Sequence, residues 1–162
     1  MAVYHCVLFD LDGTLLNTEP AIIKSYRELF KKYRTEEEFT RDKQLAVLGP
    51  SLQTMFAQYF PEQDAEQLVE EYREHNRAAH ADLVKPMDGA VELLESLKAQ
   101  GYKLGIVSTK VKEMVLLGLT LNHMDHYFDV IVGQDDVKNG KPDPEGILTA
   151  CRLVNEGHDS VI

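Results

Sequence analysis

The spacing of apolar and polar residues divides the chain into three stretches. The first, Val3–Phe9, is a short apolar run rich in β-forming residues that stops at Asp10, which predicts a buried strand entering a glycine-containing loop. In the second, residues 19–85, apolar residues recur at helical spacing, so we expect helices throughout. In the third, after Lys85-Pro86, short apolar strands alternate with amphipathic helices.

Local signals place the ends of these elements. Pro20 suits the first turn of a helix that starts at Glu19, and Thr35-Glu-Glu-Glu38 has the form of a capping box, which predicts a second helix ending near Gly49-Pro50. Two further helices are expected over 51–60 and 61–83. The third stretch is expected to contain helices over 89–100, 112–117 and 144–154 and strands over 103–107 and 129–132.

This order of elements predicts an α/β fold class. Alternating strands and helices form a parallel sheet with helices on its faces, and the first strand should join that sheet across the helical stretch. We therefore expect a discontinuous α/β core, residues 1–18 and 86–162, interrupted by an all-helical cap, residues 19–85.

Composition excludes several classes of protein. With 44% hydrophobic and 27% charged residues, the chain does not have the composition of a disordered protein. Its 17 basic and 27 acidic residues leave a formal net charge of −10, which repels phosphate backbones, so we expect no nucleic-acid partner. We also expect no membrane association, because no apolar run suits a signal peptide or a membrane span. Cys6 and Cys151 have neither zinc-site nor disulfide-framework spacing, which favours a reducing, cytoplasmic location.

Candidate chemistry gathers where the strands end, because an open parallel sheet binds ligands at the carboxyl ends of its strands. These residues are Asp10 and Asp12 after the first strand, Ser108 and Thr109 after strand 103–107, and Lys141 after strand 129–132. Two carboxylates beside a glycine turn suit an oxyanion together with a hard cation.

Each of these residues also has a plainer interpretation. Asp-x-Asp-Gly occurs in EF-hand loops, but such a loop needs glycine at its sixth position and glutamate at its twelfth, where this sequence has Gly13 fourth and Ala21 twelfth. A plain turn would leave two acids after a buried strand unexplained. The serine and threonine could cap the next helix. Lys141 could be a surface lysine, although Pro142 and Pro144 restrict the loop that presents it.

Three segments together resemble the signature motifs of the haloacid dehalogenase (HAD) superfamily of phosphohydrolases. Val7–Leu15 (VLFDLDGTL) resembles the first motif, Ile106–Lys110 (IVSTK) the second and Gly140–Pro144 (GKPDP) the third, in the family's order and spacing. The resemblance implies a Rossmann-like HAD core with a helical cap of the C1 type. Leu48–Leu52, Thr109-Lys110 and Gln134–Val137 look most like bacterial HAD pyrophosphatases and phosphoglycolate phosphatases.

The resemblance also implies roles for the residues that match the motifs. Asp10 would attack the phosphorus atom, with Mg²⁺ between the two anions held by Asp10 and the Asp12 backbone carbonyl. Asp12 would protonate the leaving oxygen and then deprotonate water, and its presence argues for phosphoryl transfer because the family's dehalogenases lack it. Lys141 would neutralise the nucleophile and the phosphate. The implied phosphate or substrate ligands are Gly13, Ser108, Thr109, Lys110 and, in the cap, Gly49.

One part of the family pattern is not in this sequence. The fourth motif, an acidic segment that supplies the remaining metal ligand, should follow Asp159–Ile162, where the sequence stops. We therefore expect the C-terminal part of the core to be missing from this chain. In the family the missing strand lies beside the first strand, so we expect Val7–Phe9 to be an exposed apolar edge that could mediate self-association.

These observations predict a Mg²⁺-dependent phosphohydrolase that acts through an aspartyl-phosphate on a small phosphorylated metabolite or on pyrophosphate. One alternative is a catalytically dead phosphate-binding or regulatory module, because the fourth motif is absent from this sequence. Another is a sugar phosphomutase, in which the phosphoenzyme donates to a sugar instead of to water.

Overall fold

The computed structural model describes residues 4–162, apart from the side chain of His158. The chain forms two units: an α/β unit made of residues 1–17 and 85–162, and a helical unit made of Thr18–Val84. Their boundaries lie one residue from those expected for core and cap.

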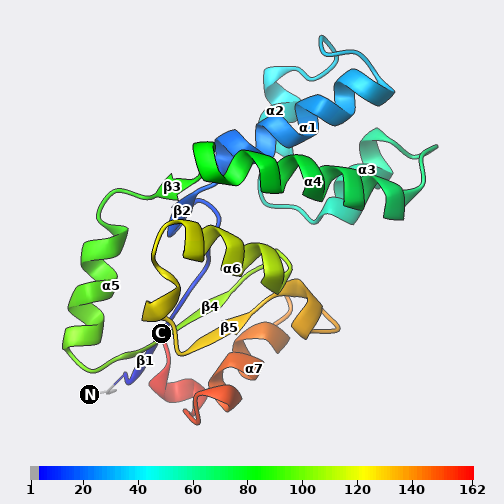
Figure 1. Ribbon diagram of the computed structural model, residues 1–162. Helices are drawn as coiled ribbons and strands as arrows, with labels where there is room; N and C mark the ends of the chain where they lie inside the picture. The colour runs from blue at the N-terminus through cyan, green and yellow to red at the C-terminus, as the bar shows by residue number, and fades with distance from the viewer. Residues whose placement is uncertain (1–3) are drawn as a thin grey trace. The chain divides into compact units, whose positions relative to one another are not determined.

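The α/β unit is built on a three-stranded parallel sheet in the order β1-β4-β5. These strands are Cys6–Phe9, Lys103–Val107 and Val130–Val132, and α5 (Ala90–Ala99), α6 (Lys112–Leu121) and α7 (Glu145–Leu153) pack around them (Figure 1). In the register Phe9 lies beside Ile106, and Val107 lies beside Val132. The predicted α/β parallel-sheet fold is confirmed.

The core of this unit lies between the sheet and α7. Buried residues there include Cys6 of β1, Val107 of β4 and Val132 of β5, which pack with Ala150 and Val154 from α7 and its end. Strands buried this way carry continuous apolar sequences, which is why short runs identify them in the sequence. α6 runs four residues beyond its expected end, to Leu121, since Gly118 and Leu119 are buried and continue its apolar face.

The outer side of β1 is partly paired. The His5 N–H donates to the Ser160 carbonyl at 2.8 Å, the Leu8 N–H to the Ile162 carbonyl at 2.7 Å, and the Ile162 N–H to the Cys6 carbonyl at 3.1 Å. Val161 thereby lies parallel to Cys6. The expectation of an exposed edge along Val7–Phe9 is wrong at Leu8, because Ile162 extends beside β1 and uses its N–H. Self-association through this edge stays a prediction.

A short antiparallel ribbon, which the sequence analysis did not predict, pairs the two chain segments that lead into and out of the helical unit. It pairs β2 (Leu16–Asn17) with β3 (Lys85–Pro86), and the Met87 N–H adds a bond to the Leu15 carbonyl at 2.9 Å. Two-residue strands are too short to produce a detectable period-two pattern.

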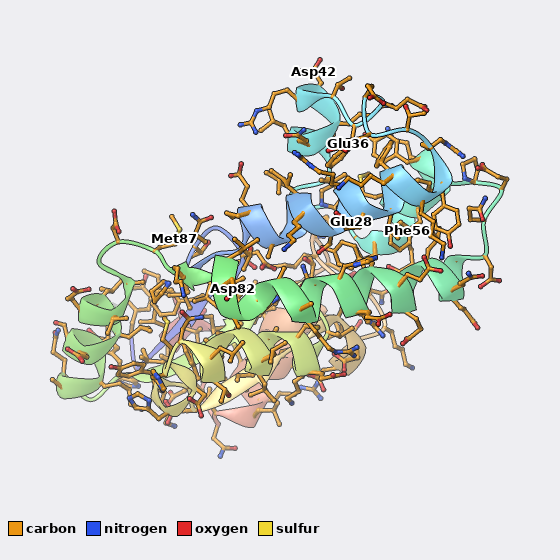
Figure 2. The ribbon with its side chains drawn as sticks, turned by 45° about the horizontal axis from the view of Figure 1, so that its top comes forward. Glu28, Glu36, Asp42, Phe56, Asp82 and Met87 are labelled. Carbon is orange, nitrogen blue, oxygen red and sulfur yellow. The ribbon has the colours of Figure 1, made fainter. Side chains whose placement is uncertain are left out.

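The helical unit contains α1 (Glu19–Tyr33), α2 (Arg41–Ala46), α3 (Leu52–Tyr59) and α4 (Ala65–Leu83) (Figure 1). An aromatic cluster fills its interior: the ring centroids of Tyr26 and Tyr72 are 5.0 Å apart, and those of Phe30 and Phe39 are 4.7 Å apart. Phe56, labelled in Figure 2, is buried in the same cluster. The unit thus has a hydrophobic core of its own.

Two helix starts in this unit differ from those expected. Glu38 does accept hydrogen bonds from the backbone N–H and hydroxyl of Thr35, at 3.1 and 3.2 Å, but the helix begins only at Arg41. The intervening turn buries Phe39 against the aromatic cluster, so tertiary packing overrides the capping signal. α4 starts at Ala65, four residues later than expected, because the Asp64 carboxylate caps it by accepting from the Gln67 N–H at 2.8 Å.

Three short 3₁₀ turns complete the described elements: η1 (Asp125–Tyr127), η2 (Gln134–Asp136) and η3 (His158–Ser160). Within residues 4–162, no helix combines the length and apolar character needed to span a membrane.

Candidate active site

Asp10 and Asp12 follow β1 in a tight turn. The Leu11 carbonyl accepts from the amides of Thr14, Leu15 and Leu16 at 3.2, 3.0 and 3.1 Å. Gly13 has φ +75°, a conformation that glycine adopts readily, and its N–H donates to the Leu16 carbonyl at 2.8 Å. The turn keeps both aspartates at the carboxyl end of β1. Because the Gly13 amide is used inside the turn, its role as a phosphate ligand stays a prediction.

Lys141 lies against Asp10. Its ammonium donates to the Asp10 carboxylate (Oδ1) and to the Val107 carbonyl, each at 2.9 Å. The two side chains remain 34% and 38% exposed, so both are accessible to a ligand. The structure thus brings together two predicted site residues that are 131 positions apart in the sequence.

The loop that presents Lys141 is held by Glu145, a residue that the sequence analysis did not single out. The Glu145 carboxylate accepts from the amides of Lys138 and Asn139 at 2.8 and 2.9 Å and from the Asn139 side chain at 3.1 Å. The backbone bonds are the main reason that the pKa of Glu145 is lowered. The signal in the sequence that could have identified Glu145 is its place directly after Pro144, as an acidic residue in the first turn of a helix.

Lys110 forms the second ion pair of the site. Its ammonium donates to the Asp12 carboxylate (Oδ1) at 2.7 Å, and the side chains of the lysine and the aspartate are 13% and 25% exposed. The Lys110 N–H donates to the Ser108 hydroxyl oxygen at 3.1 Å. Lys110 therefore touches two other predicted site residues.

Ser108 directly follows β4 and is 5% exposed. Its N–H donates to the Val132 carbonyl at 2.9 Å, which extends the β4–β5 pairing to the site. Thr109 follows it and is half-buried. Gly49 belongs to the helical unit, where it is exposed, with φ +107°, between α2 and α3. Its role as a substrate ligand stays a prediction.

The loop after β5 supports the loop after β4. The Gln134 N–H donates to the Lys110 carbonyl at 2.9 Å, and the Asp135 carboxylate accepts from the Lys112 N–H at 2.8 Å. A Cβ on Gly133 would lie 2.5 Å from the Lys112 nitrogen, so this close approach requires glycine. The sequence analysis used Gln134–Val137 only for a family resemblance and missed this bracing.

The site contains two ion pairs. Asp10 pairs with Lys141 and Asp12 pairs with Lys110, so two anions and two cations lie at neighbouring strand ends. Carboxylate and carbonyl oxygens are the ligands that Mg²⁺ prefers, and Mg²⁺ usually keeps several waters when few protein ligands are present. Over the described residues no group of three or more His, Cys, Asp or Glu could hold a metal ion, so Asp10 and Asp12 fit such an ion only as a partial ligand set.

Most of the chain matches known proteins of one hydrolase family. A family model described as haloacid dehalogenase-like hydrolase matches residues 7–162. Pyrophosphatase PpaX from Listeria monocytogenes serotype 4b (strain CLIP80459) is 42% identical over 156 residues, which are 96% of this chain and 71% of that protein.

Solved structures with the same fold include a predicted phosphatase from Clostridium acetobutylicum, with a TM-score of 0.81 and 31% identity over 99% of this chain and 74% of that one. A second is a "putative beta-phosphoglucomutase" from Thermotoga maritima, with a TM-score of 0.74 and 29% identity over 98% of this chain and 74% of that one.

The fold and these matches define an enzyme of the phosphatase type. The chain belongs to the haloacid dehalogenase-like hydrolase family, as the three sequence motifs predict.

Proposed function

We propose that this protein is a Mg²⁺-dependent phosphohydrolase that transfers a phosphoryl group to Asp10 and then to water. The observation that carries the proposal is the convergence of Asp10, Asp12 and Ser108 with Lys141 and Lys110 at the ends of β1 and β4. A carboxylate nucleophile among cations suits transfer of a phosphoryl group.

In the first step, a carboxylate oxygen of Asp10 attacks phosphorus. The bond from phosphorus to the leaving oxygen breaks, and Asp12 gives that oxygen a proton. In the second step, Asp12 takes a proton from a water molecule, whose oxygen attacks the phosphorus atom of the aspartyl-phosphate. The bond between phosphorus and the Asp10 oxygen breaks, which releases phosphate and restores the Asp10 carboxylate. Lys141 holds the Asp10 carboxylate in place and offsets the charge of the incoming phosphate, and the Ser108 hydroxyl donates to a phosphate oxygen.

Asp10 and the Asp12 backbone carbonyl would hold Mg²⁺. When bound, the ion would supply positive charge that offsets the repulsion of the Asp10 carboxylate for the phosphate.

We propose that the helical unit acts as a cap that selects the substrate, which we expect to be a small phosphorylated metabolite or pyrophosphate. The name of the Listeria relative supports pyrophosphate. A cap that closes over the substrate would exclude water until the substrate is bound.

A sugar phosphomutase is the second candidate, favoured by the name of the Thermotoga maritima protein. Both candidates use the same phosphorylated Asp10 and differ in the acceptor. A mutase would transfer phosphate to a sugar phosphate faster than it releases phosphate to water.

The test is phosphate release from pyrophosphate and from phosphoglycolate, with and without Mg²⁺, by the wild type, by Asp10→Asn and by Asp88→Asn as the control. Asp88 is an exposed aspartate of the same unit. We expect Mg²⁺-dependent release by the wild type and Asp88→Asn, and none by Asp10→Asn. Wild-type turnover by Asp10→Asn would overturn the mechanism, and phosphate binding without turnover by the wild type would favour a binding module.

A further inference from the structure

We propose that Lys110 is a positioning residue that acts through Asp12 and Ser108 and not as a direct ligand of the substrate phosphate. This inference rests on the proposed function, because it assigns Lys110 to the proton transfer made by Asp12. It replaces the role of phosphate ligand that the sequence implied for Lys110.

The side chain of Lys110 carries the first part of the argument. Its ammonium lies 2.7 Å from Asp12 Oδ1, and its side chain, at 13% exposure, is the least exposed of the four charged side chains in the two ion pairs. A largely buried ammonium needs a partner to offset its lost hydration, and Asp12 is that partner here. In contrast, Lys141 is 34% exposed beside Asp10 and is open to an incoming anion.

The backbone of Lys110 carries the second part. Its N–H donates to Ser108 Oγ at 3.1 Å, so this oxygen is an acceptor and its own hydrogen is free to point at a phosphate oxygen. The Lys110 carbonyl accepts from the Gln134 N–H at 2.9 Å. The residue is therefore anchored on both sides of its Cα, to the end of β4 and to the loop after β5.

These contacts determine how Asp12 is presented. Because Lys110 engages Oδ1, the other carboxylate oxygen of Asp12 is the one left for the proton given to the leaving group and then taken from water. Proton transfer in a transition state needs the donor at hydrogen-bond distance, and a misplacement of about 1 Å can cost about 100-fold in rate. Without the ammonium, the carboxylate would rotate away from this orientation.

The experiment compares Lys110→Met with wild type on two substrates that differ in their leaving group. An alkyl phosphate such as phosphoglycolate needs a proton on its leaving oxygen, whereas p-nitrophenyl phosphate has a leaving group that departs without one. Because the second step is common to both substrates, the readout is the first step alone, measured as release of the leaving group in a single turnover. We expect this rate in Lys110→Met to fall about 10- to 100-fold on the alkyl phosphate and less than about 3-fold on p-nitrophenyl phosphate, with KM nearly unchanged on both. Lys110→Arg, which keeps the charge, should restore part of the loss.

The matched control is Lys112→Met. Lys112 lies two residues further on, is 42% exposed and pairs with Asp136 at 3.5 Å, outside the proposed machinery. Its activity should equal wild type on both substrates. A loss there as large as that of Lys110→Met would mean that any lysine lost from this loop has the same effect, and would overturn the assignment.

Combination with Asp12→Asn separates the remaining outcomes. If Lys110 acts through Asp12, Lys110→Met should add almost nothing to the loss caused by Asp12→Asn alone on the alkyl phosphate. If the losses of Lys110→Met and Asp12→Asn multiply in the double variant, Lys110 acts as a phosphate ligand and the proposal is overturned. The same conclusion follows if Lys110→Met raises KM and loses activity equally on both substrates. Failure of the proposed function looks different, because Asp10→Asn would then keep the activity of the wild type, or the wild type would turn over neither substrate.

Discussion

Gly105 lies in the middle of the central strand β4, and replacing it by alanine should destabilise the α/β unit. A Cβ at this position would lie 2.5 Å from Val130 Cγ1 and 2.6 Å from Leu8 Cδ2. Both atoms belong to neighbouring strands, so β1 and β5 or their side chains must shift. Such overpacking costs about 1–3 kcal/mol, and the better strand conformation of alanine returns about 0.5–1 kcal/mol of that.

We therefore expect Gly105→Ala to lower the free energy of unfolding by up to about 2.5 kcal/mol, measured as a lower urea midpoint at unchanged slope. At about 2–4 °C per kcal/mol for a chain of this size, the melting temperature should fall by up to about 10 °C. Because Ser108 directly follows β4, phosphate release should fall as well.

Gly157→Ala is the matched control for this prediction. A Cβ on Gly157 would have no neighbour within 4 Å, and its φ lies outside the left-handed range. The control should be as stable as wild type or up to about 1 kcal/mol more stable, through its effect on the unfolded chain. Equal stabilities for the two variants would refute the reasoning that close strand packing requires glycine at Gly105.

Three more predictions follow from charged groups. Lys141→Met removes a charged hydrogen bond of about 1.5–3 kcal/mol from Asp10, so kcat for phosphate release should fall about 10- to 150-fold, and wild-type kcat would contradict this. Glu145→Gln leaves one acceptor oxygen where two backbone amides need two, so hydrogen exchange at Lys138 and Asn139 should speed up; unchanged exchange would mean that the loop is held elsewhere. The Glu145 contribution should be complete above the ordinary glutamate pKa and disappear as pH falls through its lowered pKa. Burial opposes ionisation of Glu71, but hydrogen bonds from Lys32, Gln67 and Tyr33 lower its pKa from 4.5 to about 2. Its stabilisation should therefore be complete above pH 4.5 and lost toward pH 2. At neutral pH, Glu71→Gln should cost about 1–3 kcal/mol in urea unfolding, a difference that should shrink in acid; a pH-independent difference would refute the assignment.

Much of the site could be predicted because its residues follow strands. Asp10 and Ser108 directly follow β1 and β4, which are adjacent and parallel, so any correct assignment of the two strands places both residues at one edge. Lys141 could be predicted from its motif, and the structure brings its ammonium to 2.9 Å from Asp10. The pairing of Lys110 with Asp12 could not be predicted, because it joins residues 98 positions apart and depends on where a flexible four-carbon side chain ends.

Local patterns in the sequence therefore determined the types of element, the parallel sheet and the candidate nucleophile, since periodicity and motif spacing are properties of neighbouring residues. Only the tertiary structure decided which charges pair, how Glu145 holds the loop of Lys141, where α2 begins and what lies beside β1. Each of these depends on distances between segments that are remote in sequence, where a few ångströms decide whether a hydrogen bond forms.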